Sequence, residues 1–105
     1  KIASEVTDSD DVALEKLLQT KGAITYFPLQ VLNDYKSEGN PIKDISFNAI
    51  KATYNSIASG EYFIHRRLNV ITNGKPKGPA NLFTDYILSE EGQKLIEKAG
   101  FLKLN

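Results

Sequence analysis

The chain has 105 residues, of which 41% are hydrophobic and 25% are charged, with 13 basic and 13 acidic side chains. Its length predicts one domain, and its neutral charge balance argues against a nucleic-acid or membrane-surface binder, which would normally carry a basic excess. No cysteine is present, which excludes disulfides and cysteine-ligated zinc.

The N-terminal half alternates between helical and β patterns. Ser9 is a good N-cap residue, and Asp10 and Asp11 would lie in the first turn of a helix, where the helix dipole favours negative charge. Leucines then recur at helical spacing. Short apolar, β-leaning runs lie on both sides of a second helical stretch. In chain order, we expect helix 10–20, strand 23–27, helix 29–36 and strand 42–47.

The stretch 45–68 is the most informative part of the chain. Thr53 can cap a small helix that Gly60 stops, and the long alternating segment Tyr62–Thr72 then predicts a strand. One face of that strand would carry Tyr62, Ile64, Arg66, Leu68 and Val70, and the other would carry Phe63, His65, Arg67, Asn69 and Ile71.

The C-terminal part predicts two helices after a loop, 73–78, that is rich in turn residues. Pro79 fits the first position of a helix, because its missing N–H costs nothing there. Ser89 can cap the last helix, and Gly100 is placed to end it in a left-handed turn. We expect the last helix to bury Leu95, Ile96 and Ala99.

Three segments resemble, in the same order, the phosphate-binding receptors that feed ABC phosphate importers. Gly22–Tyr26 is similar to the family's Gly-Ala-Ile-Gly-Tyr strand, the stretch 45–68 to its strand, turn and Ser-Gly-x-Tyr element, and Gly78–Phe101 to its terminal helix pair. The helix pair also occurs in receptors for molybdate, tungstate and sulfate, so the oxyanion stays open. The chain departs from the family where Thr25 and Asn48 replace glycine and where Ala52, Phe63 and Arg67 replace proline.

The resemblance implies an α/β fold, a partial type II periplasmic-binding-protein-like lobe with a short mixed or parallel sheet flanked by helices. It implies a single domain, 1–105, in which residues 1–27 end one lobe and residues 28–105 form the crossover and the end of the other lobe. The family's anion-gripping motifs, a serine- or threonine-containing turn and an Arg-x-x-Ser-Gly-Thr-like motif, are not found. Because the first residue is lysine and methionine is absent, we expect a processed or cut chain, the C-terminal part of such a receptor.

Candidate anion ligands lie in one loop and on one strand. Thr72, Lys75, Lys77 and Gly78 precede a helix N-terminus, where two lysines and free backbone N–H groups could hold an anion; a solvated turn is the simpler interpretation. Arg66 matches the family's arginine, and it would either line the ligand cleft or form a structural ion pair.

The other polar features have structural explanations. His65 is the only histidine and has no nucleophile or paired carboxylate at a plausible spacing, so we expect no catalytic role. Glu90 and Glu91 suit the start of a helix. The acidic run Asp8, Asp10 and Asp11 lacks the glycine and distal glutamate of a calcium loop, so we interpret it as a solvated helix start and expect no metal site.

The sequence therefore predicts part of an extracytoplasmic receptor, periplasmic or extracellular and associated with the membrane at the cell surface. The receptor would capture inorganic phosphate or a similar oxyanion and deliver it to an ABC transporter permease, while this chain alone would bind the anion weakly. We expect no enzymatic activity, no cofactor and no nucleic-acid partner. Exposed apolar faces predict a homodimer or strand exchange between copies. The alternative is a stand-alone interaction or regulatory domain with no small-molecule ligand.

Overall fold

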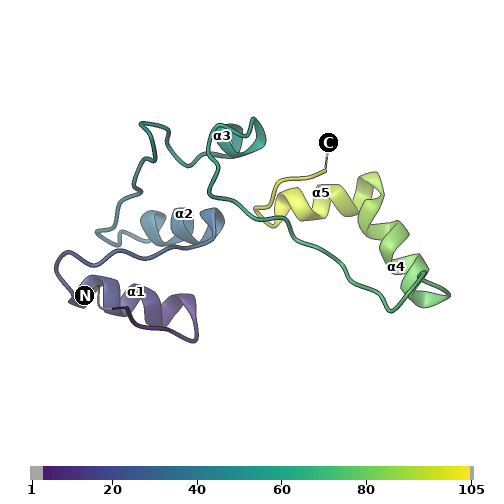
Figure 1. Ribbon diagram of the computed structural model, residues 1–105, viewed down its shortest axis with the longest axis horizontal. Coiled ribbons are helices and arrows are strands. Elements are labelled where there is room, and N and C mark those ends of the chain that lie inside the picture. The colour runs from purple at the N-terminus through teal and green to yellow at the C-terminus, as the bar shows by residue number, and fades with distance from the viewer. Residues whose placement is uncertain (1–3, 105) are drawn as a thin grey trace. The chain divides into compact units, whose positions relative to one another are not determined.

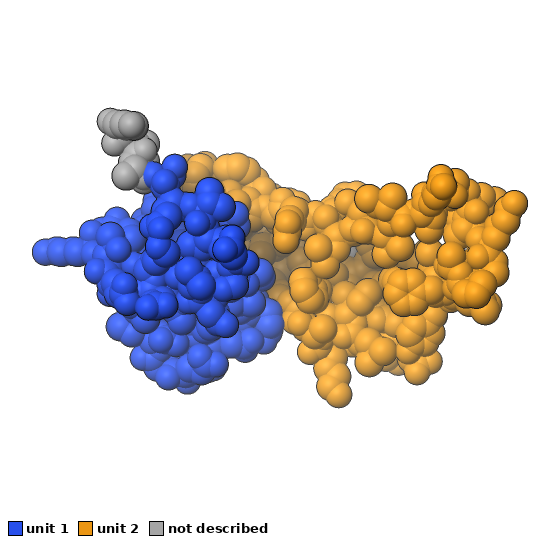
Figure 2. Space-filling view, turned by 90° about the horizontal axis from the view of Figure 1, so that it is seen from below, with its two compact units in different colours: residues 1–45 blue, residues 46–105 orange. Residues whose placement is uncertain are grey.

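The computed structural model describes residues 4–104, which form five helices joined by long connections (Figure 1). The chain divides into two compact units, residues 1–45 and residues 46–105, which are coloured separately in Figure 2. Unit 1 holds α1 and α2, and unit 2 holds the remaining three helices. The helices are α1 (Asp10–Gln19), α2 (Leu29–Ser37), α3 (Tyr54–Ala58), α4 (Pro79–Leu88) and α5 (Glu90–Lys98).

The predicted helices are confirmed, and so are the side chains that start them. The Ser9 hydroxyl accepts a hydrogen bond from the Val12 N–H at 3.3 Å at the start of α1. The Ser89 hydroxyl accepts one from the Gly92 N–H at 3.2 Å at the start of α5. Each cap satisfies a backbone donor that has no partner inside the helix, which is why short polar side chains fix these boundaries from local sequence alone.

Two further boundaries depend on local hydrogen bonds. Thr53 begins α3 in a capping box, in which the Thr53 hydroxyl accepts from the Ser56 N–H and the Ser56 hydroxyl accepts from the Thr53 N–H. At the end of α5, the Gly100 N–H donates to the Glu97 carbonyl and the Phe101 N–H to the Ile96 carbonyl. These two bonds form the Schellman motif that the sequence predicted at Gly100.

The predicted sheet is wrong. Within residues 4–104 the segments 23–27, 42–47 and 62–72 form no strand, and the single β-bridge joins Phe47 and Ile50. A strand exists only when a neighbouring segment pairs with its backbone, and in the described part of the chain these segments have no such neighbour. Figure 1 shows the connection between α3 and α4 running without a partner strand. The pattern of alternating side chains was present, but the pairing was not.

The bridge is a two-residue hairpin turn. The Phe47 and Ile50 backbones exchange two hydrogen bonds of 2.9 Å, and both central residues have positive φ, 49° at Asn48 and 64° at Ala49. Positive φ at both positions is characteristic of a type I′ turn. The turn brings the Phe47 ring against the Phe63 ring at a centroid distance of 4.6 Å, in an edge-to-face arrangement.

Few side chains are buried. Among residues 4–104 only Ala13, Tyr35, Ser56 and Gly92 are buried. The prediction that α5 buries its apolar residues is wrong for Leu95 and Ala99, which are exposed, because α5 is covered by little besides α4. Twenty large hydrophobic side chains of the described residues are exposed, far more than isolated surface positions explain. Apolar surface of this extent marks faces that another surface would cover.

Unit 1 is organised around the ring of Tyr35. That ring packs edge-to-face on Phe27 with centroids 5.4 Å apart, and its hydroxyl donates a hydrogen bond of 2.6 Å to the Asp11 carboxylate. The contact joins α2 to the first turn of α1. The pKa of Tyr35 is raised from 10.0 to about 12. The phenol donates a hydrogen bond to the Asp11 carboxylate, and burial and the nearby negative charge raise the pKa further.

We expect the tyrosine titration to report this contact. The raised pKa stabilises unit 1 fully below pH 10, and that stabilisation is lost as the pH rises from 10 towards 12. In the ultraviolet absorbance of tyrosinate, Tyr35→Phe should remove the part of the titration that occurs at the highest pH. Asp11→Asn should move that part to lower pH. An unchanged late part in Tyr35→Phe would contradict the assignment.

The corner between α4 and α5 is the tightest contact of unit 2. Gly92 lies against the last turn of α4, where an added Cβ would overlap the Tyr86 carbonyl oxygen and lie 2.8 Å from the Ile87 carbonyl oxygen. The Gln93 amide donates to the same Ile87 carbonyl at 2.8 Å and accepts from the Leu104 N–H at 2.7 Å. The corner therefore requires a glycine for its close approach and a glutamine for its hydrogen bonds.

Gly92→Ala should open this corner, because the clash involves backbone atoms that have no room to move. We expect a loss of about 1–3 kcal/mol in the free energy of unfolding, measured by circular dichroism during denaturation. Glu91→Ala, at the exposed neighbouring position, is the matched control and should change stability much less. Equal stability of the two variants would contradict the close approach.

Candidate functional site

The loop that carries four of the five candidate anion ligands is closed on itself. The Thr72 hydroxyl donates a hydrogen bond of 2.8 Å to the Gly74 carbonyl, so its proton is engaged within the loop. Lys75 and Lys77 are exposed and make no ion pair with any residue in 4–104. The loop therefore presents two exposed cations and one hydroxyl that already has a partner.

Gly78 forms the N-cap of α4 with φ 54° and ψ −132°, a conformation that only glycine adopts without strain. Because Gly78 has no side chain, no side-chain cap satisfies the first N–H groups of the helix. Pro79 follows as the first helical residue, which confirms the predicted start of α4. Anion binding at Gly78 stays a prediction, beside the simpler interpretation of the loop as a solvated turn.

Arg66 lies in the unpaired segment between α3 and α4 and is exposed. Within the part of the chain that the structure describes, no carboxylate forms an ion pair with Arg66, and no hydrogen bond links Arg66 to the loop 72–78. Its neighbour Arg67 is exposed as well. The five candidates are therefore not gathered into one site by contacts within the chain, and their role as ligands stays a prediction.

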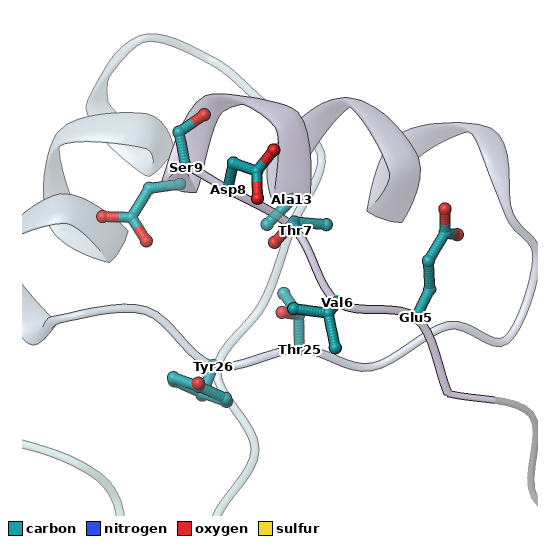
Figure 3. Close-up of a pocket in the computed structure, with 9 residues that line it drawn as sticks. Glu5, Val6, Thr7, Asp8, Ser9, Ala13, Thr25 and Tyr26 are labelled. Carbon is teal, nitrogen blue, oxygen red and sulfur yellow. The ribbon is translucent and has the colours of Figure 1, made fainter.

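A pocket of about 400 Å³ lies in unit 1 and was not predicted from the sequence (Figure 3). The segment that leads into α1 forms one wall, and Thr25 and Tyr26 form the other. Three carboxylates, four hydroxyl-bearing residues and the apolar Val6 and Ala13 lie together in the lining. The complete lining is Glu5, Val6, Thr7, Asp8, Ser9, Asp10, Ala13, Thr25 and Tyr26.

The charge of this pocket decides what it can hold. Glu5 is paired with Lys16, but Asp8 and Asp10 make no ion pair with the described residues. An anion such as phosphate would be repelled by these carboxylates, whereas a cationic group would be attracted. No grouping of His, Cys, Asp and Glu within residues 4–104 is arranged to hold a metal ion. In the sequence, the signal for this acidic pocket was the acidic run 8–11, which was interpreted as a solvated helix start.

None of the helices formed by residues 4–104 combines the length and the apolar character needed to cross a bilayer.

Charge is distributed unequally between the two units. Residues 1–45 contain five basic and eight acidic side chains, a net charge of −3, and residues 46–105 contain eight basic and five acidic side chains, a net charge of +3. All four ion pairs found among the described residues are formed within a unit and join neighbouring parts of the chain. The opposite charges of the units are therefore left unbalanced by these pairs.

The chain is similar to bacterial phosphate-binding proteins over nearly its whole length. It is 36% identical over 104 residues to Phosphate-binding protein PstS 2 of Streptococcus agalactiae, a match that covers 98% of this chain and 33% of the relative. It is 32% identical to Phosphate-binding protein PstS of Bacillus subtilis, with 90% of this chain and 30% of the relative covered. The Borreliella burgdorferi protein of the same name is also 32% identical, with 92% and 34% covered.

Other comparisons return nothing: no protein-family model matches the chain, and no solved structure is significantly similar to it. The chain spans about a third of the length of the curated relatives it matches. The resemblance found in the sequence is confirmed by these relatives, which share one name. This chain is thus a relative of the phosphate-binding proteins and corresponds to about a third of one.

Proposed function

We propose that this chain is the C-terminal segment of a receptor that captures inorganic phosphate and delivers it to an ABC importer. The observation that carries the proposal is the match of 98% of the chain to a phosphate-binding protein at 36% identity, a match that runs through both units. The receptor would work outside the cytoplasm, at the cell surface, with a transporter permease as its partner.

The geometry supports a share in binding and not a complete site. Phosphate recognition needs several directed donors around one dehydrated anion. Among the candidates, Arg66, Lys75 and Lys77 are exposed, and no ion pair among residues 4–104 brings them together. The Thr72 hydroxyl donates its hydrogen bond to the Gly74 carbonyl. The pocket of unit 1 is acidic and repels an anion. The remaining ligands would come from the rest of the receptor, with closure around the anion completing the site.

The chain also fits a binding protein better than an enzyme. His65, the one histidine, has an exposed ring whose Nδ1 lies 3.2 Å from the Tyr62 carbonyl oxygen, and no nucleophile is arranged beside it. We infer that the chain has no catalytic function, because the relatives that it matches are named as phosphate-binding proteins.

The isolated chain should bind phosphate weakly. Isothermal titration calorimetry with inorganic phosphate should give a Kd above about 1 mM, because the exposed cations alone do not replace the hydration shell of the anion. A Kd near 1 µM would contradict the proposal that the site is shared with the rest of a receptor.

A chimera tests the receptor function directly. The homologous third of the Streptococcus agalactiae relative is replaced by this chain, and binding of phosphate is compared with binding of sulfate and molybdate. We expect the chimera to prefer phosphate, and we expect Arg66→Ala to weaken binding by at least about tenfold if Arg66 is a ligand. Arg67→Ala, which changes the neighbouring charge on the opposite face, is the matched control.

A chimera that folds but binds none of the three anions would favour the alternative, a stand-alone interaction domain. Tighter binding of sulfate or molybdate than of phosphate would keep the receptor and change its ligand. Equal effects of the two arginine substitutions would remove Arg66 from the site.

A further inference from the structure

The alternating sequence of the segment Tyr62–Thr72 would give it unequal faces once it pairs as a strand with another chain. Ile64 and Leu68 flank Arg66 on one face, whereas His65 and Asn69 flank Arg67 on the other. The first face is thus apolar with a single central charge, and the second is polar at its centre. Ile64 and Leu68 are 54% and 65% exposed, so the apolar face is uncovered.

The backbone of this segment is equally unpaired. Among residues 4–104, no backbone hydrogen bond is made by the N–H or C=O groups of residues 66–71. An extended, apolar segment with free backbone groups is the kind of edge that adds to another chain.

The pocket of unit 1 has the complementary chemistry. Asp8 and Asp10 bring negative charge that no ion pair with a described residue balances. Val6 and Tyr26, 92% and 89% exposed, bring apolar surface beside that charge. An apolar surface with a central cation is complementary to an apolar surface with carboxylates, and the opposite net charges of the two units, +3 and −3, would add long-range attraction between copies.

We propose that the acidic pocket of unit 1 receives the face Ile64–Arg66–Leu68 of a second copy of this chain, with Arg66 against Asp8. Every copy carries both surfaces, so two copies can make the same contact twice, and the proposed assembly is a reciprocal two-fold dimer. Arg67 lies on the outer face of the bound segment and stays in solvent.

The first experiment measures the mass of the purified 105-residue chain by sedimentation equilibrium at increasing protein concentration. We expect a monomer–dimer equilibrium at low salt that shifts towards monomer as salt is added, because the Debye length falls from about 10 Å at 0.1 M to about 3 Å at 1 M ionic strength. A monomer at every concentration overturns the proposal. So does association that strengthens with salt, since that would show apolar aggregation without charge recognition.

The second experiment tests which face is bound. Arg66→Glu should weaken dimerisation by at least about tenfold, because it places like charges together, while the matched control Arg67→Glu should weaken it much less. Asp8→Arg should weaken it like Arg66→Glu, and the double variant with both changes should recover most of the loss. Equal weakening by Arg66→Glu and Arg67→Glu, or no recovery in the double variant, overturns the proposed contact.

This inference does not rest on the proposed receptor function. The mass measurement uses no phosphate and the chimera test uses no second copy, so either result can fail while the other stands. Circular dichroism of each variant checks that its helices are retained, so that a loss of dimer is not mistaken for a loss of fold.

Discussion

The pairing of extended backbone is the constraint on which the rest of this structure depends. Each non-proline residue outside a helix carries an N–H and a C=O group that a neighbouring segment or water must satisfy, and residues 66–71 have no such neighbouring segment within the described chain. Where the backbone satisfies itself, in the five helices and the Asn48–Ala49 turn, the structure is formed. Where a second segment would be needed to pair with the backbone, no strand forms among the described residues.

Burial follows from this constraint. A sheet would have provided a surface on which the apolar faces of the helices could pack, and without it the pairing of α4 with α5 is the one extensive contact between helices in the described part of the chain. The contacts that remain are small and specific: the ring of Tyr35 between Phe27 and Asp11 in unit 1, and the corner around Gly92 in unit 2. The Tyr54 hydroxyl adds a hydrogen bond of 3.0 Å to the Gly100 carbonyl, which joins α3 to the turn after α5. These contacts hold each unit together with little apolar area.

The distribution of charge gives the open surfaces direction. The net charge of the whole chain is zero, but unit 1 is acidic and unit 2 is basic. In both units, unpaired charges lie beside exposed apolar side chains. In the proposed receptor, the cations of unit 2 would face an anion together with ligands from the remaining length of the protein. In the isolated chain, the same cations would face the carboxylates of a second copy. In both proposals Arg66 would act between Ile64 and Leu68, whose apolar side chains would exclude water from its charge once the contact is made.

The sequence by itself determined what depends on neighbouring residues. Ser9, Thr53 and Ser89 set the helix starts, Gly100 set the last helix end, and the motifs in 45–68 and 78–101 indicated the family that the relatives confirm. Only the tertiary structure decided the absence of a sheet, the exposure of Leu95, and the acidic pocket that joins residues 5–10 to Thr25 and Tyr26. The physical reason is that caps and turns close hydrogen bonds within a few residues, whereas strands and pockets need partners that no local pattern specifies.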